Sequence, residues 1–571
     1  MSKARPQPCL HLDGLKAYRP PRAKAPTDLR LDANEGPPPP PELLALLREV
    51  EAADVHRYRS SAPLEKVLAD RVGLDPAQVM IGAGADEVID RLCRVYVQPD
   101  REVIVPTPTF EMICHLARVS GGRLKRVAWT GEDFPVDDVC AAVTPETGLI
   151  VVISPNNPTG LAVRPAELVA VAEAAPHAVV LVDLAYAAYA DEDLLGTVLR
   201  LPNAVAVNTL SKTEGLAGLR LGYAISSPEM LQPMRLAGGP FPVSNLSRAV
   251  AERWLVAGRS HIQWIVARVR SERETLQQLL AYYGAVSLPS QANFVFARFT
   301  DNLWVRDAMA GFGIAVRLVP ATDGFAEGIR ISCPADAAGF ARLCAALATV
   351  LSPEALLFDM DGVLADVSRS YRRAIVETAA TFGVQIGAED VAAAKAAGGA
   401  NDDWELTRRL LAERGVEVDL PAVKECFKRL YQGDAAKPGL CAEESLLPER
   451  ALLERFAERL PLAIVTGRPR EDAERFLAEH DVADLFAAVV CREDGPLKPN
   501  PAPLRVALEK LGVDRAWFIG DTTDDISAAR HAGALPLGVQ NNVDTAAETA
   551  MYEAGAARVL TNLRQLEDLL P

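Results

Sequence analysis

The stretch 355-ALLFDMDGVLAD-366 predicts a buried strand that ends in two carboxylates. The apolar residues 355–358 form the strand, and Asp359 and Asp361 follow it. Gly362 lets the chain turn at this point, so both carboxylates can approach one centre. Ligands bind at the carboxyl ends of the strands in open α/β sheets, so the stretch indicates a catalytic site. It begins more than halfway along a chain of 571 residues.

Three further motifs follow, each at the end of a predicted strand. They are 463-AIVTGR-468, 495-GPLKPNP-501 and 518-FIGDTTDDI-526, which contribute Thr466, Lys498, Asp521, Asp524 and Asp525. Calcium-binding loops also carry closely spaced aspartates, but they lack the preceding apolar strand and the later threonine, lysine and aspartate. Over residues 355–571 the set resembles the haloacid-dehalogenase superfamily, which implies a Rossmann-like α/β domain.

This resemblance implies a role for each residue of the set. Asp359 is the expected nucleophile, which becomes an aspartyl phosphate, and Asp361 is the expected general acid and base. Thr466 and Lys498 are expected to bind the phosphoryl oxygens. A magnesium ion is expected on Asp359, the backbone carbonyl of Asp361, Asp521 and, through water, Asp525. Superfamily members that do not hydrolyse phosphate esters commonly lack an acid at the position of Asp361, so a phosphatase is implied.

A mostly helical segment interrupts this part of the chain. It covers about residues 367–447 and resembles the α-helical cap of subfamily I of the same superfamily. Such a cap closes over the site, excludes water and selects the leaving group. Arg369 and Arg372 lie where the cap begins, and we interpret them as solvated surface charges.

The residues before 350 contain five polar clusters among alternating predicted strands and helices, which is typical of a parallel sheet. The clusters are 82-GAGADE-87, 106-PTPTF-110, 154-SPNNPTG-160, 180-VLVDLAY-186 and 209-TLSKTEGLAGLRLGY-223. The first lacks the third glycine of a dinucleotide-binding loop, but its amides at a helix N-terminus suit a phosphate. Asp183 ends a wholly apolar strand, where a carboxylate is costly unless a cation faces it.

In this order the clusters resemble the fold-type-I pyridoxal-phosphate aminotransferases and, within them, the histidinol-phosphate aminotransferases. The resemblance covers about residues 10–350 and implies pyridoxal 5'-phosphate as the cofactor. Lys212 would bond to the cofactor aldehyde and, once displaced by substrate, move the proton. Asp183 would pair with the pyridinium nitrogen.

Further cofactor contacts are implied by the same resemblance. Asn157 and Tyr186 would bind the 3'-oxygen, and Phe110, usually a tyrosine in the family, would stack on the ring. The phosphate would be held by Ala85, Asp86, Ser211, Arg220 and Tyr58. Tyr58 matches a tyrosine that family members lend across a dimer interface, so a homodimer is implied.

The substrate of this part is less well defined by its motifs. Asn34, Arg317 and Arg330 match substrate-binding positions of the family. Leu184 replaces a glutamate of the family pattern, and a proline replaces the aromatic residue that often follows the N-terminal motif. The same scaffold hosts decarboxylases of phosphorylated amino acids and general aminotransferases, so these activities remain alternatives.

We therefore predict an α/β protein with two parts. Residues 1–350 form an aminotransferase, with a large α/β domain at about 45–245 and a small α+β domain at about 10–44 plus 246–350. Residues 351–354 are the linker, and residues 355–571 form the hydrolase with its cap. A length of 571 residues is consistent with several domains.

Composition limits the partners. The net charge of −16 argues against binding to nucleic acid or to anionic membranes. No run of 18 apolar residues occurs, so we expect no membrane span. Nine cysteines without a CxxC pair are typical of reduced thiols, so we expect a cytoplasmic protein. The two resemblances imply that its substrates are small molecules.

Together, the two resemblances imply consecutive steps of histidine biosynthesis. The first part would convert imidazole-acetol phosphate and glutamate to histidinol phosphate and 2-oxoglutarate, and the second would hydrolyse histidinol phosphate to histidinol. Two alternatives stay open. The first part would act on another phosphorylated amine, or the second would be a phosphatase of different specificity or a regulatory module.

Overall fold

The computed structural model describes residues 12, 14–15, 22–396, 402–434, 437–540 and 544–571. The contacts divide the chain into two compact units, which are described separately. The first contains Leu31–Asn302 and Val316–Arg342, and the second contains Arg22–Arg30, Leu303–Ala315 and Leu343–Pro571.

A seven-stranded sheet forms the centre of the first unit. Its order is β2 (Val79–Gly82), β8 (Gly222–Ile225), β7 (Ala204–Thr209), β6 (Val179–Asp183), β5 (Thr147–Ile153), β3 (Glu102–Thr107) and β4 (Arg123–Ala128). All neighbours are parallel except β8, which runs antiparallel to both β2 and β7. The inner strands are almost wholly apolar because both faces of such a sheet are covered.

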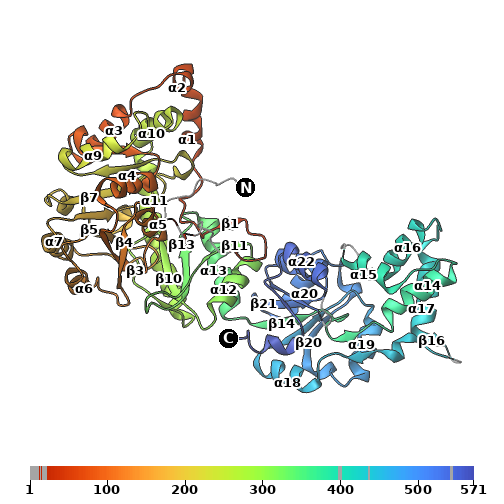
Figure 1. Ribbon diagram of the computed structural model, residues 1–571. Coiled ribbons are helices and arrows are strands. Elements are labelled where there is room, and N and C mark those ends of the chain that lie inside the picture. The colour runs from red at the N-terminus through yellow and green to blue at the C-terminus, as the bar shows by residue number, and fades with distance from the viewer. Residues whose placement is uncertain (1–11, 13, 16–21, 397–401, 435–436, 541–543) are drawn as a thin grey trace, which may run out of the picture. The chain divides into compact units, whose positions relative to one another are not determined.

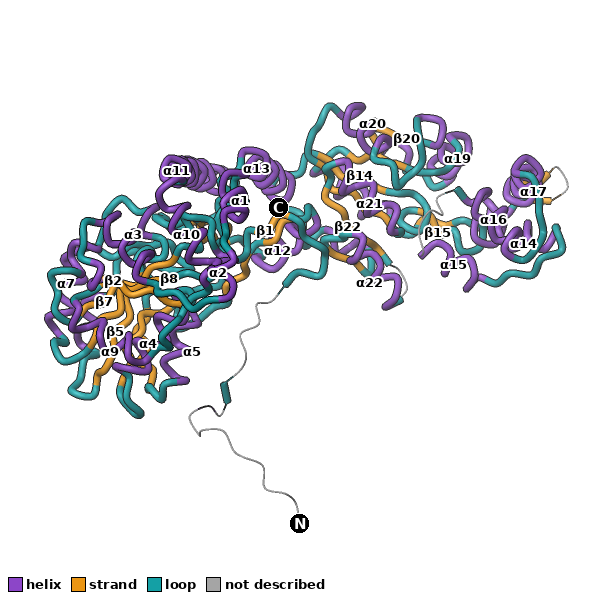
Figure 2. Tube along the Cα trace, turned by 90° about the horizontal axis from the view of Figure 1, so that it is seen from above, coloured by secondary structure: helices purple, strands orange, loops and turns teal. Residues whose placement is uncertain are grey.

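Alternate residues of these strands enter two separate cores. One core receives α3 (Ala62–Val72), α6 (Val136–Ala141), α7 (Pro165–Ala174) and α10 (Asn245–Ala257). The other receives α4 (Ala85–Tyr96), α5 (Glu111–Val119) and α9 (Pro228–Ala237), which lie along the same side of the sheet in Figure 2. The parallel strands β3, β5, β6 and β7 therefore end at one edge, where the polar clusters follow them.

A smaller antiparallel sheet completes this unit. Its order is β12 (Arg317–Val319), β13 (Gly328–Ser332), β10 (Phe294–Arg298) and β9 (Val286–Ser287), and α11 (Arg259–Tyr282) packs against it. Before the large sheet, α1 (Pro41–Ala45) and α2 (Ala52–His56) lie beside α10 (Figure 1).

The second unit contains a six-stranded sheet that is entirely parallel. Its order is β20 (Phe486–Val490), β19 (Leu462–Val465), β14 (Ala355–Phe358), β21 (Ala516–Gly520), β22 (Leu535–Val539) and β23 (Arg558–Leu560). The connecting helices are α18 (Arg450–Arg459), α19 (Arg470–Glu479), α20 (Ala502–Leu511), α21 (Thr523–Ala532) and α22 (Thr545–Ala554). Phe358 stacks on Phe456 of α18, while Leu357 enters the core formed with α20 and α21, so both faces are covered.

Four helices of this unit form the cap. They are α14 (Tyr371–Thr381), α15 (Ala388–Ala396), α16 (Asp403–Glu413) and α17 (Leu420–Gln432), which gather beyond one end of the sheet in Figure 1. Two short antiparallel strands, β15 (Ala365–Asp366) and β18 (Ser445–Leu446), connect the cap to the sheet. The cap is therefore attached through one pair of adjacent connections.

Residues from before the expected linker also pack in the second unit. Helix α12 (Asn302–Gly311) places Trp304 edge-on against Trp517 of β21, with ring centroids 5.3 Å apart. The indole nitrogen of Trp517 donates a hydrogen bond of 2.8 Å to the carbonyl of Thr349 in α13 (Ala337–Leu351). Strand β1 (Leu29–Arg30) pairs with β11 (Ile314–Ala315). Segments that the sequence assigns to the first part thus belong by contact to the second unit.

A search of the described helices for a candidate membrane span found none of sufficient length and hydropathy.

Candidate active sites

In the first unit, two of the predicted cofactor residues, Asp183 and Lys212, lie at the carboxyl ends of β6 and β7. Asp183 is the last residue of β6 and is 5% exposed. Burial raises the pKa of its carboxyl group to about 6, the hydrogen bond from the amide of Ala185 opposes this shift, and the charge of Asp86 adds to it. A cationic partner would lower this pKa and stabilise the ionised carboxylate.

Lys212 lies in the loop that follows β7. Its Nζ donates a hydrogen bond of 3.3 Å to the carbonyl of Ala33 and lies 5.8 Å from the ring centroid of Tyr186. The Tyr186 hydroxyl accepts a hydrogen bond from Nδ2 of Asn34, whose Oδ1 accepts one from Ser332. The predicted lysine, tyrosine and asparagine therefore share one site.

The predicted substrate arginines enter the same site from the small sheet. Arg330 is 8% exposed, and its Nη1 donates a hydrogen bond of 2.7 Å to Oδ1 of Asn157. Its Nη2 donates one of 2.6 Å to the carbonyl of Asp32. Arg317 lies directly opposite Arg330 on the neighbouring strand. Two cationic side chains thus come from adjacent strands, as expected for anion binding.

The N-terminus of α4 is available to an anion. Ala85 is its first residue, and the preceding Gly84 provides no side-chain cap. A Cβ on Gly222 would lie 2.2 Å from the amide nitrogen of Ala85, so only glycine allows this close approach. Arg220, with a φ of 52°, donates from Nη2 to Asp86 at 3.2 Å. Free amides and a guanidinium group therefore lie together, as a phosphate requires.

Three predicted cofactor residues lie apart from these contacts. Ser211 is buried and accepts a hydrogen bond from Thr209. Phe110 precedes α5 and is half-buried against the core beneath it. Tyr58 is 83% exposed and stacks on Phe241 at 4.7 Å. Within the described part of the chain, Tyr58 makes no hydrogen bond or ring contact with the other predicted cofactor residues.

In the second unit, Asp359 follows β14 and is 5% exposed. Lys498 donates a hydrogen bond of 2.7 Å to Oδ1 of Asp359 and lies 2.5 Å from Oδ1 of Asp525. Burial raises the pKa of Asp359 well above its usual range, and the neighbouring carboxylates of Asp525, Asp361 and Asp521 add to this while Lys498 opposes it. These four carboxylates together carry more negative charge than Lys498 alone can balance.

Asp359, Asp521 and Asp525 each offer an oxygen atom within 4.8 Å of the others. Gly362, with a φ of +78°, lets the chain pass close to Asp521, since a Cβ there would lie 2.0 Å from Oδ2. Asp525 is fully buried and accepts hydrogen bonds from the amide and hydroxyl of Thr522. The turn and the start of α21 therefore hold the acidic set in place.

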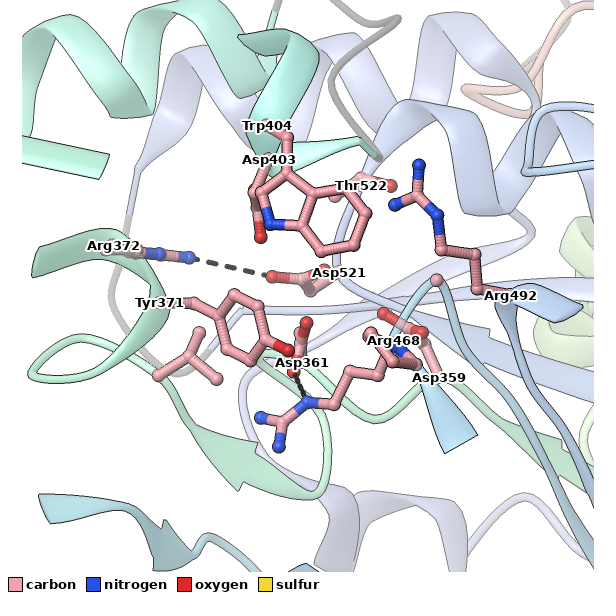
Figure 3. Close-up of a pocket in the computed structure, with 13 residues that line it drawn as sticks. Asp359, Asp361, Tyr371, Arg372, Asp403, Trp404, Arg468, Arg492, Asp521 and Thr522 are labelled. Atoms are coloured by element: carbon pink, nitrogen blue, oxygen red, sulfur yellow. Dashed lines mark hydrogen bonds and ion pairs between the residues drawn. The ribbon is translucent and has the colours of Figure 1, made fainter. Parts of the chain in front are cut away.

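A pocket lies between this acidic set and the cap (Figure 3). Tyr371, Arg372, Asp403 and Trp404 line it from the cap. Arg372 pairs with Asp521 at 3.7 Å, so it faces the site, although the sequence suggested a surface charge. Thr466 is buried, and its hydroxyl accepts a hydrogen bond from the amide of Arg468.

Residues 28–347 match the model of the family of class I and II aminotransferases. The chain belongs to this family. Residues 353–533 of this aminotransferase match the model of the haloacid dehalogenase-like hydrolases, so it carries a hydrolase domain as well. Both resemblances inferred from the motifs, and the α/β fold class, are confirmed.

Similar proteins cover different shares of the chain. A histidinol-phosphate aminotransferase of Paracoccus denitrificans is 36% identical over 277 residues, which are 48% of this chain and 75% of that protein. The solved histidinol-phosphate aminotransferase of Sinorhizobium meliloti, in complex with pyridoxal-5'-phosphate, is 26% identical with a TM-score of 0.55. The match covers 61% of this chain and 98% of the Sinorhizobium meliloti chain.

An imidazoleglycerol-phosphate dehydratase of Phytophthora nicotianae is 44% identical over 237 residues, which are 38% of this chain. This chain spans 52% of the length of that protein.

The residues of both sites fit the groups that the families imply. In the aminotransferase site, burial raises the pKa of Asp183 despite the charge of Lys212, so a pyridinium group would fit beside this carboxylate, and the N-terminus of α4 beside Arg220 suits a phosphate. In the hydrolase site, three converging carboxylates form the hard oxygen donor set that magnesium prefers.

The motifs did not single out Arg468, which lines the pocket, or Glu444, which contacts Arg468. Arg468 stands two positions after Thr466 and is completely buried, with its Nε 2.6 Å from Oδ1 of Asp361. Its position within 463-AIVTGR-468 was the only available signal. Nothing in the sequence marks Glu444, which lies 24 residues away and contacts both Nη atoms of Arg468.

Proposed function

We propose that this chain is a bifunctional enzyme of histidine biosynthesis. Its first part would transfer an amino group from glutamate to imidazole-acetol phosphate, and its second part would release phosphate from the resulting histidinol phosphate. One observation carries this proposal. The same chain contains two sites at strand ends, and acidic and cationic side chains lie close together in each. The named relatives support the pathway because two of them act on, or carry the name of, histidinol phosphate.

In the first site, the residues would divide the work between proton transfer and binding. Bound pyridoxal 5'-phosphate would withdraw electrons from the carbon that carries the amino group. Nζ of Lys212 would move the proton that leaves this carbon, and the carboxylate of Asp183 would hold the ring nitrogen in its protonated form. Arg330, oriented by Asn157 and the carbonyl of Asp32, would bind the carboxylate of glutamate.

In the second site, the carboxylate of Asp359 would attack phosphorus while the bond to the alcohol oxygen breaks. Asp361 would give a proton to that oxygen and then take one from the water that hydrolyses the aspartyl phosphate. Lys498 and Thr466 would bind the phosphoryl oxygens. Bound magnesium would neutralise charge so that an anionic carboxylate can approach an anionic ester. Water then restores Asp359 and releases inorganic phosphate.

We also propose a homodimer formed through the first part. Large apolar side chains stand exposed on α1, α2, α10 and the segments next to these helices, and they include Leu44, Leu47, Val55, Tyr58, Phe241 and Leu246. A second copy of the chain would cover this surface and receive Tyr58 at its own cofactor phosphate. Sedimentation should give twice 61.3 kDa. Tyr58→Ser should weaken cofactor retention without changing the absorbance of the retained cofactor, whereas a 61.3 kDa species with full cofactor affinity would contradict the proposal.

The described cysteines are free thiols, which supports our proposal of a cytoplasmic location.

Matched variants test the two assignments separately. With imidazole-acetol phosphate, glutamate and magnesium, Asp359→Asn should accumulate histidinol phosphate and 2-oxoglutarate without releasing phosphate. Lys212→Ala should form no 2-oxoglutarate but should still hydrolyse added histidinol phosphate. If either substitution abolished both activities in a folded protein, the residue assignments would be wrong.

A further inference from the structure

Arg468 lies at the point where the acidic site meets the cap. It follows Thr466 in the loop after β19, and its side chain is 0% exposed. Nε donates a hydrogen bond of 2.6 Å to Oδ1 of Asp361, as Figure 3 shows. The guanidinium group lies over the rings of Tyr371 and Phe476, at 4.8 and 5.3 Å from their centroids. The arginine side of this contact is therefore shielded from water, which strengthens a charged hydrogen bond, while the Asp361 side chain stays 22% exposed toward the pocket.

Glu444 balances the charge of this arginine. Its carboxylate is 3% exposed and accepts hydrogen bonds from Nη1 and Nη2 of Arg468 at 2.9 and 3.2 Å. This paired geometry fixes the plane of the guanidinium group. Since Glu444 supplies a full negative charge, Asp361 is not needed as the counterion of Arg468. Nε, which faces Asp361 and not Glu444, therefore serves to orient the carboxyl group of Asp361.

Glu444 also joins this arginine to both connections of the cap. It immediately precedes β18, the returning connection, and accepts a hydrogen bond of 2.6 Å from Ser370, which precedes α14. It accepts another of 3.0 Å from the hydroxyl of Tyr431 on α17. A shift of the cap that moved Ser370 or Tyr431 would therefore move Glu444, and with it Arg468.

We propose that Arg468 is a positioning residue that holds Asp361 toward the leaving oxygen, and that Glu444 makes this orientation depend on the seating of the cap. The proposal rests on the phosphatase function proposed above. It fixes Oδ1 of Asp361 on Arg468 and leaves Oδ2 for the leaving group. A purely structural arginine would instead stabilise the cap without favouring any class of leaving group.

The leaving group separates these two roles. The full-length protein with magnesium is assayed with L-histidinol phosphate, whose alkoxide needs a proton to depart, and with p-nitrophenyl phosphate, whose phenolate does not. The ratio kcat/KM reports the steps up to departure of the leaving group. A positioned general acid contributes roughly 10²–10⁴-fold. Arg468→Met should therefore lower kcat/KM for the alkyl ester about 100-fold and for the aryl ester less than about 5-fold.

A double-variant cycle tests whether Arg468 acts through Asp361. In an Asp361→Asn background, Arg468→Met should cause no further loss on the alkyl ester beyond about two-fold, since coupled residues are not additive. Tyr431→Phe should show the same preference for the aryl ester with a smaller loss. Arg470→Met is the matched control. Arg470 stands two positions after Arg468 and pairs with Asp494, so its replacement should change kcat/KM for neither ester.

Equal losses on both esters, or losses that add in the double variant, would overturn the proposal. If Arg468→Met does not fold, as judged by circular dichroism, Arg468→Lys and Glu444→Gln carry the same comparison of the two esters. Magnesium-dependent hydrolysis of p-nitrophenyl phosphate by the unaltered protein tests the phosphatase function separately. Failure of that protein on histidinol phosphate alone would count against the substrate, and glycerol 3-phosphate would then serve as the alkyl ester.

Discussion

Two buried aspartates define this molecule at the scale of single residues. Asp183 and Asp359 each end an apolar strand, and burial raises the pKa of both. Asp359 has Lys498 at 2.7 Å, whereas the burial of Asp183 is opposed by the amide of Ala185 and by the charge of Lys212. The cationic ring of a bound cofactor would stabilise the ionised Asp183. The cost of burying this charge should therefore appear in the free energy of unfolding of the cofactor-free protein.

The pKa of Asp183 predicts how that cost depends on pH. A carboxyl group whose pKa rises from 3.8 to about 6 on folding holds its proton more tightly in the folded state. Folding therefore becomes less favourable as the pH rises from 4 to 6, and the penalty is complete above pH 6. At 1.36 kcal/mol per pKa unit, Asp183→Asn should raise the free energy of unfolding of the cofactor-free protein by up to about 3 kcal/mol at pH 8.

Urea unfolding at two pH values measures this effect. At pH 4 the substitution should change the free energy of unfolding by less than about 1 kcal/mol, because the carboxyl group is then protonated in the folded state and still partly protonated in the unfolded state, where its pKa is 3.8. An equal gain at pH 4 and pH 8 would show that burial of the charge is not the cause.

At the scale of elements, the turn after β14 determines the geometry of the phosphatase site. Gly362 has a φ of +78°, and it approaches Asp521 so closely that no side chain fits between them. Strand β14 brings Asp359 to the sheet edge, while β15 leads into the cap. One glycine therefore controls both the acidic set and the departure of the chain toward the cap.

Gly362→Ala should weaken magnesium binding because the added Cβ would displace Asp521. We expect the magnesium concentration for half-maximal phosphatase activity to rise about tenfold or more, which corresponds to about 1.4 kcal/mol. Gly383→Ala is the matched control, because Gly383 also has a positive φ of +84° but has no atom within 4 Å of the new Cβ. It should lower stability by about 1–2 kcal/mol and leave the magnesium dependence unchanged. Equal effects of the two variants would contradict this account of the turn.

Sequence patterns predict strand-end residues well and contacts between distant segments poorly. Asp183, Asp359 and Asp521 each follow an apolar strand, so the edge of the sheet that gathers them follows from the pattern. Arg468 follows β19 and Glu444 precedes β18, so their contact depends on how these two segments are placed in the fold. Arg372 was expected to be a surface charge, but it pairs with Asp521. This pairing depends on how α14 is placed, which the sequence pattern does not show.

At the scale of the whole molecule, the second unit includes segments from well before its first strand. Trp517 is fully buried beneath Trp304 of α12 and the end of α13. Arg558 lies over the ring of Trp304, 5.1 Å from its centroid, and pairs with Asp307. The hydrolase core is therefore completed by residues that the sequence assigns to the aminotransferase part.

Trp304→Ala should destabilise the second unit by about 3–5 kcal/mol, the usual cost of deleting a buried aromatic side chain. The phosphatase activity should therefore be lost at a lower temperature, while its rate at 25 °C stays unchanged. Trp264→Ala is the control, since Trp264 is 53% exposed and its removal should change stability by less than about 1 kcal/mol. An unchanged midpoint of phosphatase inactivation in Trp304→Ala would show that α12 does not support this unit.

The central claim is that both sites act in succession on one phosphorylated compound. The direct measurement is the time course of 2-oxoglutarate and inorganic phosphate formed by the unaltered protein from imidazole-acetol phosphate, glutamate and magnesium. We predict that phosphate release requires glutamate, follows 2-oxoglutarate after a lag and reaches one phosphate per 2-oxoglutarate. Phosphate release at the same rate without glutamate, or 2-oxoglutarate formation without any phosphate, would contradict the claim.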